Sequence, residues 1–398
     1  MINLISLLTR AVADGASDVH LKLGQPPILR LEGDLEQMDG TPALTEADLE
    51  CVLDEVTLIS PKRRHLFDDS GDLDVAFSHP LLPRFRVNGF RQRGATSFAF
   101  RIIPSEIPNF VELGLPPGVT RLAEERRGLV LVTGATGSGK TTSLASMIDH
   151  INRTRRQHIV TIEDPIEILH PDRGCIVNQR EVGLDTASFE QALRRVLRQD
   201  PDVILIGELR DAETARTALQ AAESGHLVFS TLHTIDAAET IGRMIEFFPP
   251  SKQQQIRSIL AGTLRGVISQ RLLPRTDGGR VASVEVMVTN ARIQDLIREG
   301  RSDEITDAIE AGEYFQMQTF ARSLIELVLA GTVDRETAAN AATNRHDFMV
   351  ALERAEKHEA ALQREAEQTA GSERDSAAND AAGARPAGVS LLRQSPHL

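Results

Sequence analysis

A phosphate-binding loop is the clearest chemical feature of the sequence. Residues 134–141 read Gly-Ala-Thr-Gly-Ser-Gly-Lys-Thr and match G-x-x-x-x-G-K-[ST], between an apolar stretch at 129–132 and a helix-compatible stretch at 142–152. Glycines let the backbone close around phosphate, and the amides at the start of the following helix face the anion. The residues predicted to hold a nucleotide are Gly134, Thr136, Gly137, Ser138, Gly139, Lys140, Thr141 and Thr142.

Two side chains of this loop have predicted tasks. Lys140 is expected to reach the β- and γ-phosphates, and the Thr141 hydroxyl is expected to ligate Mg²⁺. The predicted cofactors are therefore ATP and Mg²⁺. A glycine-rich turn that binds no ligand is the alternative, and the strand-loop-helix context argues against it.

Two acids follow apolar stretches that are typical of buried parallel strands. Glu163 follows residues 158–162, and Glu208 follows residues 203–206 through Gly207. Parallel strands end at one edge of their sheet, so both carboxylates should lie beside the loop, where hydrolysis needs an aligned water. We predict Glu163 as the catalytic base and Glu208 as the acid that orients Mg²⁺ and water, and both as metal ligands. Either acid alone could equally be a helix cap or an ion-pair partner.

Two histidines flank a fourth apolar stretch at 227–230. His226 and His233 could sense the γ-phosphate from the ends of that strand. A lone histidine is more often a structural residue, so the residues alone leave both interpretations open.

The composition excludes several classes of function. The 398 residues carry a formal net charge of -13, which argues against a nucleic-acid partner. One Tyr and no Trp argue against a base-stacking surface, and two distant cysteines form no metal-ligand spacing. No apolar run approaches the ~20 residues that span a bilayer. We therefore expect a cytoplasmic protein that meets the membrane only through partners.

The patterns along the chain predict two domains. Alternating stretches at 18–23 and 84–90 indicate a small antiparallel sheet with helices within residues 1–103. Repeated prolines indicate a linker at 104–120, because proline continues neither a helix interior nor a strand ladder.

The second predicted domain, residues 121–362, alternates apolar strands with helices at 188–198 and 211–224. After about Ser251 the pattern is largely helical. Residues 363–398 have too few apolar side chains to offset the entropy of ordering them, so we expect a disordered tail.

The order of the motifs resembles that of secretion ATPases. The loop at 134–141 is followed by an acidic stretch at 161–167, by Gly207-Glu208 and by a histidine stretch at 225–234. The wording of these motifs is similar to that of the PilT-type retraction ATPases of type IV pili. The likeness extends to residues 15–21, 177–182, 268–272 and 317–320.

This resemblance implies an α/β fold class with a PAS-like α+β N-terminal domain, followed by a RecA-like P-loop ATPase domain with a helical C-terminal region. It implies a homohexameric ring at the inner face of the cytoplasmic membrane, with nucleotide bound between the domains. The implied partners are an inner-membrane pilus platform protein and a paralogous retraction ATPase. The implied function is an ATP-hydrolysing motor for pilus retraction, or twitching motility.

The resemblance also implies roles for individual residues. Glu163 matches the catalytic glutamate of the acidic box, Glu208 matches the Walker B glutamate, and His226 and His233 match the histidine box. Two arginines match N-terminal-domain arginines that approach the γ-phosphate, where a guanidinium can neutralise transition-state charge. They are Arg86 and Arg101.

One helix departs from the family pattern. The retraction signature A-I-R-N-L-I-R-E reads here Ile-Gln-Asp-Leu-Ile-Arg-Glu at 293–299, with Gln294 and Asp295 where Arg and Asn are expected. An accessory ring subunit that binds nucleotide and regulates a partner retraction motor is therefore an alternative. A pilus assembly or type II secretion ATPase is another, although such proteins usually carry a longer N-terminal region and a four-cysteine metal site.

Overall fold

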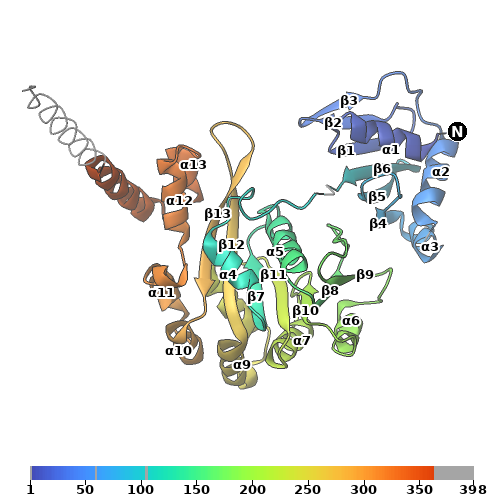
Figure 1. The fold of residues 1–398 in the computed structure, drawn as a ribbon. Helices are drawn as coiled ribbons and strands as arrows, with labels where there is room; N and C mark the ends of the chain where they lie inside the picture. Colours follow the sequence, from blue (N-terminus) through green and yellow to red (C-terminus); the bar gives the residue numbers. More distant parts are fainter. Residues whose placement is uncertain (1, 59–60, 104–105, 363–398) are drawn as a thin grey trace, which may run out of the picture.

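Two sheets, each with its own hydrophobic core, organise the computed structural model, which describes residues 2–58, 61–103 and 106–362 (Figure 1). The predicted α/β fold class, with an α+β domain ahead of a P-loop domain and a helical C-terminal region, is confirmed. The predicted disordered tail at 363–398 lies outside the described residues. Among the helices that are described, none has both the length and the apolar character needed to cross a bilayer.

The N-terminal domain contains an antiparallel sheet in the order β3-β2-β1-β6-β5-β4. Phe85, Val87 and Gly89 of β5 are buried and alternate with more accessible residues, as expected for a sheet with one face on the core. Four phenylalanines, Phe67, Phe85, Phe98 and Phe100, are fully buried there. The elements are α1 (Leu4–Ala13), β1 (Asp18–Lys22), β2 (Ile28–Leu31), β3 (Asp34–Gln37), α2 (Glu46–Thr57), α3 (Pro61–Ser70), β4 (Asp72–Phe77), β5 (Phe85–Gln92) and β6 (Ala95–Ile102).

The P-loop domain is built on a second sheet in the order β13-β12-β7-β11-β10-β8-β9, in which only β13 runs antiparallel to its neighbour. Every residue of β7, β10 and β11 is buried, which explains their nearly continuous apolar sequences. The strands are β7 (Gly128–Thr133), β8 (His158–Glu163), β9 (Ile176–Glu181), β10 (Val203–Ile206), β11 (Leu227–Leu232), β12 (Leu264–Pro274) and β13 (Arg280–Val288).

Helices cover this sheet, and their ends follow local sequence signals. Ser188 and Asp211 cap the helices predicted near 188–198 and 211–224, each accepting a hydrogen bond from a first-turn amide. These helices are α4 (Pro117–Ala123), α5 (Lys140–Thr154), α6 (Phe189–Val196), α7 (Ala212–Glu223), α8 (Ala237–Glu246) and α9 (Pro250–Thr263).

The C-terminal helices lie on the β13 side of the sheet, whereas the N-terminal domain lies on the β9 side (Figure 1). They are α10 (Ala291–Glu299), α11 (Ile305–Glu310), α12 (Phe320–Leu329) and α13 (Arg335–Ala341), with short 3₁₀ turns at Ser302–Glu304 and Glu313–Phe315 and a further helical stretch at 345–362.

The prediction that the chain is largely helical after Ser251 is wrong for β12 and β13. Polar residues interrupt the apolar pattern of β12, but they are buried and their partners come from distant segments. Ser269 Oγ lies 3.0 Å from Thr133 Oγ1, and Gln270 Nε2 donates to Ser143 Oγ at 2.8 Å. Tertiary hydrogen bonds therefore pair the Ser269 hydroxyl and the Gln270 amide nitrogen in a strand whose sequence has no clear period.

The predicted linker at 104–120 overlaps the first helix of the P-loop domain. Helix α4 begins at Pro117, and Val119 is fully buried in the core of that domain. Proline is well suited to the first turn of a helix, since its missing amide would have no partner there. Residues 117–120 therefore belong to the P-loop domain.

The burial of Val119 predicts that two valines of the predicted linker contribute differently to stability. Val119→Ala should lower the free energy of unfolding of the P-loop domain by about 2 kcal/mol, because apolar contacts are lost in a closed core. Val111→Ala is the matched control, since Val111 is 88% exposed and should change stability by less than about 0.5 kcal/mol. Urea denaturation would measure both. Equal stability of the two variants would mean that α4 is not part of the core.

Candidate nucleotide site

A cavity of about 530 Å³ lies between the two domains and gathers most of the predicted site residues. The loop contributes one wall, two acids and a histidine contribute the next, and the N-terminal sheet contributes two arginines. The predicted residues that line it are Thr136, Gly137, Gly139, Lys140, Thr141, Thr142, Glu163, Glu208, His233, Arg86 and Arg101. Gly134 and Ser138 line an adjoining hollow with Gln270.

The loop between β7 and α5 has the backbone shape that its glycines predict. Gly134 and Gly139 have φ values of 141° and 89°, a region that residues with a Cβ rarely adopt. A Cβ at Gly134 would stand 2.4 Å from the carbonyl oxygen of Gln270, so β12 also requires glycine there. Ser138 Oγ is buried in the loop without a hydrogen-bond partner. An anion with several acceptor oxygens fits this cradle.

Lys140 lies at the start of α5 and points back into the loop. Its Nζ donates to the carbonyl oxygens of Gly134 and Ala135, at 2.7 and 2.9 Å. Burial lowers the pKa of Lys140, and the nearby carboxylates of Glu208 and Glu167 partly oppose that effect. A phosphate would supply the negative charge that this buried ammonium lacks, so the position suits the predicted role.

Glu163 ends β8 in a restrained position. Thr161 Oγ1 and Gln179 Nε2 both donate to its Oε1, at 2.6 and 3.1 Å. Burial raises the pKa of Glu163, while these two hydrogen bonds and one from the Glu167 backbone lower it in part. A carboxylate with a raised pKa is a stronger base, which suits proton removal from a water.

Glu208 follows β10 and has the opposite electrostatic environment. An ion pair with Arg210 is the main cause that lowers the pKa of Glu208, and His233 Nε2 lies 3.6 Å from its Oε2. Glu208 is therefore ionised over a wide pH range and suits the orientation of a cation or water. The environments of the two glutamates push their pKa values apart, which is the usual sign of divided roles in acid–base chemistry.

Arg86 and Arg101 approach the cavity from adjacent strands of the N-terminal sheet. They are register partners on β5 and β6, so their side chains share one face. Arg86 contacts Asp74 at 3.2 Å and Glu167 of the P-loop domain at 3.7 Å, and Arg101 contacts Asp18 at 2.9 Å. The side chain of Arg101 remains 69% exposed. Both guanidinium groups are thus available to the highly charged phosphates of a nucleotide.

The structure separates the two predicted histidines. His233 follows β11 and lies in the cavity, but His226 precedes β11 and lies at the opposite edge of the sheet. There, its Nδ1 lies 2.9 Å from the Ala221 carbonyl oxygen, and its own carbonyl accepts from Gly128 at the start of β7. A six-residue strand places the two histidines roughly 20 Å apart. His226 is therefore not brought to the site.

Sequence reasoning missed the side chains that hold the two acids. Thr161 and Gln179 restrain Glu163, and Arg210 pairs with Glu208. Gln179 lies within the family-like stretch 177–182, which was a signal, although nothing local connects it to Glu163.

A cation at this site would depend on the nucleotide. In the part of the chain that the structure describes, no three or more His, Cys, Asp or Glu side chains are grouped to hold a metal by themselves. Thr141 and the two glutamates line the same cavity, so they could complete a shell to which phosphate oxygens also contribute. This donor set of hydroxyl and carboxylate oxygens fits Mg²⁺.

Comparison with known proteins gives consistent matches. The profile of the Type II/IV secretion system protein family matches residues 81–344. The chain is 44% identical over 347 residues to the type IV pilus retraction ATPase PilT of Pseudomonas aeruginosa, covering 87% of this chain and 100% of that protein. It is 40% identical to the type IV pilus ATPase PilU of the same organism, covering 87% and 90% of the two chains.

A solved structure matches as well. The crystal structure of the pilus retraction motor PilT with bound ADP superposes with a TM-score of 0.81 at 44% identity. The match covers 87% of this chain and 99% of that chain.

The environment of Glu163 predicts a pH effect. A base must be ionised, so hydrolysis should fall as the pH drops through the raised pKa of Glu163. Thr161→Val removes a hydrogen bond that favours the carboxylate, so the pKa should rise further and the acidic limb of the kcat profile should move to higher pH. Thr154→Val, at an exposed threonine of α5, is the control. An acidic limb that stays in place would contradict the assignment of Glu163 as base.

Proposed function

The chain belongs to the Type II/IV secretion system protein family, and from this premise we propose that it is the ATP-hydrolysing motor of type IV pilus retraction. The observation that carries the proposal is the interdomain cavity. It combines a phosphate loop, two glutamates with opposite pKa shifts and two arginines from a second domain. The 44% identity to PilT over the whole length of that protein supports the same assignment.

The residues divide the work of hydrolysis. Lys140 and the amides of the loop bind the phosphates, and Glu163 accepts a proton from the attacking water. Glu208 and His233 orient groups near the γ-phosphate from the ends of β10 and β11. Mg²⁺, held by Thr141 with Glu208 and Glu163, would neutralise charge on the phosphate oxygens.

The two arginines connect chemistry to movement. Arg86 and Arg101 pair with carboxylates, and a bound triphosphate competes for them with a greater negative charge. The N-terminal domain is thereby drawn towards the γ-phosphate before hydrolysis and released after it. Such arginines are worth ~10³–10⁵ in rate in other phosphoryl-transfer enzymes.

The family resemblance extends the proposal to the assembly. The chain forms a homohexameric ring at the inner face of the cytoplasmic membrane and acts on an inner-membrane pilus platform protein. A paralogous retraction ATPase is a further partner, and the PilT–PilU pair of Pseudomonas aeruginosa supports this possibility.

A second candidate function, an accessory ring subunit that regulates a partner motor, is favoured by helix α10. Ile293, Leu296 and Ile297 are buried, so the packing face of the helix is intact. On its exposed face, Arg298 donates to Asp295 at 2.8 Å and to Gln294 at 3.4 Å. Gln294 and Asp295, which depart from the retraction signature, therefore form hydrogen bonds with Arg298, the arginine that the signature retains.

The proposed chemistry predicts a separation of binding from hydrolysis. Glu208→Gln should lower the rate of ATP hydrolysis by about 100-fold or more, because the water and cation lose their orienting carboxylate. Its affinity for a fluorescent ATP analogue should stay within about 3-fold of wild type. Lys140→Ala, in contrast, should lose both nucleotide binding and ATP hydrolysis. Glu310→Gln, at an exposed glutamate of α11, is the control. Wild-type turnover by Glu208→Gln would refute the role of that residue.

The proposed retraction function predicts the phenotype of a deletion in a piliated host. Loss of the protein should leave cells with many pili and no twitching, measured by electron microscopy and a motility assay. Reduced twitching with a remaining motor would indicate the accessory role, and absence of pili would indicate assembly. Complementation with the double variant Gln294→Arg, Asp295→Asn tests α10, since a gain of twitching speed would show that these two residues limit retraction.

A further inference from the structure

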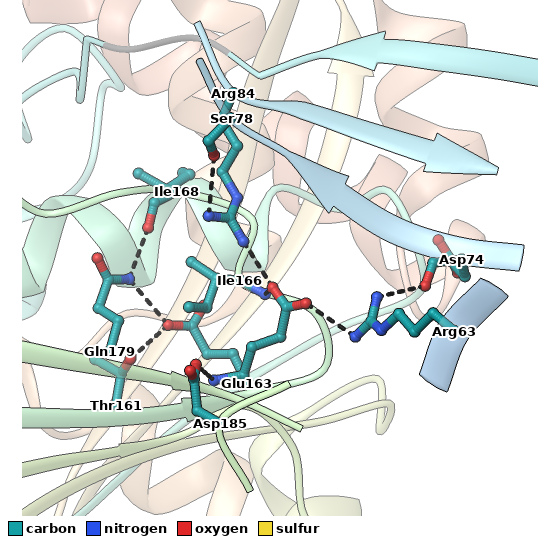
Figure 2. A network of polar contacts seen from close by, with 11 residues as sticks. Arg63, Asp74, Ser78, Arg84, Thr161, Glu163, Ile166, Ile168, Gln179 and Asp185 are labelled. Carbon is teal, nitrogen blue, oxygen red and sulfur yellow. Dashed lines mark hydrogen bonds and ion pairs between the residues drawn. The ribbon is translucent and has the colours of Figure 1, made fainter. Parts of the chain in front are cut away.

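A buried glutamate outside the nucleotide cavity joins the two domains. Glu181 ends β9 in the P-loop domain and is only 1% exposed. Its Oε1 lies 3.2 Å from Nη2 of Arg63 on α3, and its Oε2 lies 2.6 Å from Nη2 of Arg84, directly before β5. Figure 2 shows Arg63 and Arg84 reaching from the N-terminal domain to one carboxylate of the P-loop domain, that of Glu181. We call these three residues the interdomain ion cluster.

The geometry of the interdomain ion cluster makes it a specific docking point. Both arginine side chains are largely buried, and Arg63 also donates to the Asp74 carbonyl oxygen at 2.7 Å. On the other side, the Glu181 amide donates to Asp185 Oδ2 and the Asp185 amide donates to the Glu181 carbonyl oxygen, so the backbone that carries the carboxylate is held in place. Removal of one partner would leave a buried charge without compensation, so the domains cannot slide past this point without a large energetic cost.

Glu181 is also connected to the loop that follows Glu163, which we call the catalytic loop. It is the register partner of Glu163 on the adjacent parallel strand, and its Oε2 accepts a hydrogen bond from the Ile166 amide at 3.3 Å. Gln179, two residues earlier on the same face of β9, donates to Glu163 and to the Ile168 carbonyl oxygen. Strand β9 therefore holds the loop that follows Glu163 at two points, and one of them is shared with the N-terminal domain.

The same cluster places the arginines of the cavity. Arg84 and Arg86 are two residues apart in an extended segment, so their side chains project to the same side. Arg84 is fixed on Glu181, and Arg86 reaches Glu167 of the same catalytic loop at 3.7 Å. Any displacement of Arg84 from Glu181 would move Arg86 and its register partner Arg101 away from the cavity.

We propose that Glu181 is a positioning residue that couples the docking of the N-terminal domain to the geometry of Glu163 and Arg86. When Arg63 and Arg84 are paired with Glu181, Glu163 and Arg86 are both held in their positions at the cavity. When the domains separate, neither Glu163 nor Arg86 is held there. This inference deepens the ATPase function proposed above and rests on it, but it concerns a residue that touches neither the nucleotide cavity nor its phosphate loop.

The first test is kinetic. Glu181→Gln should lower kcat for ATP by about 10- to 100-fold and leave the affinity for a fluorescent ATP analogue within about 3-fold, since the loop at 134–141 is untouched. Arg84→Met should have a similar effect. The double variant should be no slower than the slower single variant, because the residues act as one unit. Arg84→Lys, which keeps the charge, should recover part of the lost rate.

A neighbouring arginine provides the control. Arg64 is adjacent to Arg63 on α3, but its ion pairs with Glu50, Asp54 and Asp68 all lie within the N-terminal domain. Arg64→Met should therefore leave kcat within about 2-fold of wild type, even if it lowers the melting temperature of the N-terminal domain.

The second test does not depend on activity. Hydrogen exchange of the peptide that contains Ile166 should become at least about 10-fold faster in Glu181→Gln and in Arg63→Met, but not in Arg64→Met. Faster exchange with lower kcat supports the inference. Unchanged kcat and exchange in Glu181→Gln, with an active wild type, would overturn it and leave the ATPase proposal standing. An inactive wild type would overturn the ATPase proposal, and the exchange result would then decide whether Glu181 positions the loop.

Discussion

The common carboxyl edge of the parallel strands β7, β11, β10 and β8 is the constraint on which the site depends. These four strands are neighbours in that order, and each places one candidate site feature at its end: the phosphate loop, His233, Glu208 and Glu163. Strands in a sheet are about 4.8 Å apart, so groups from distant parts of the sequence reach one cavity. The same rule accounts for His226, which starts β11 and is therefore at the opposite edge.

The edge of the sheet brings Glu163 and Glu208 together, but the surroundings of the two carboxylates shift their pKa values in opposite directions. Burial raises the pKa of Glu163, and the hydrogen bonds that its carboxylate accepts from Thr161 and Gln179 offset that effect only in part. Glu208 pairs with Arg210, so its pKa falls. One residue is thus suited to accept a proton and the other to remain charged. The difference arises from burial and from one arginine, since the side chains themselves are chemically identical.

The N-terminal sheet takes part in the site through arginines in two positions. Arg86 and Arg101 face the cavity, whereas Arg63 and Arg84 meet Glu181 at the domain boundary. The start of β5 connects the two groups, because Arg84 directly precedes the strand and Arg86 lies two residues further along it. The N-terminal domain therefore contacts the P-loop domain at the boundary and contributes two arginines to the cavity, which is the arrangement on which the proposed coupling of hydrolysis to movement rests.

Features whose residues are contiguous in the chain can be recognised from local sequence patterns. The loop at 134–141 carries its glycines, lysine and threonine in one stretch, and the alternation at 84–90 and the apolar run at 203–206 indicate their strands locally. Features whose partners are distant in the sequence depend on how the chain folds. The sequence does not indicate β12, because its buried Ser269 and Gln270 form hydrogen bonds with the distant Thr133 and Ser143. The pairing of Glu181 with Arg63 and Arg84 likewise spans the two domains. A local pattern records the conformation of a segment, whereas the partners of a buried polar group depend on which segments the fold brings together.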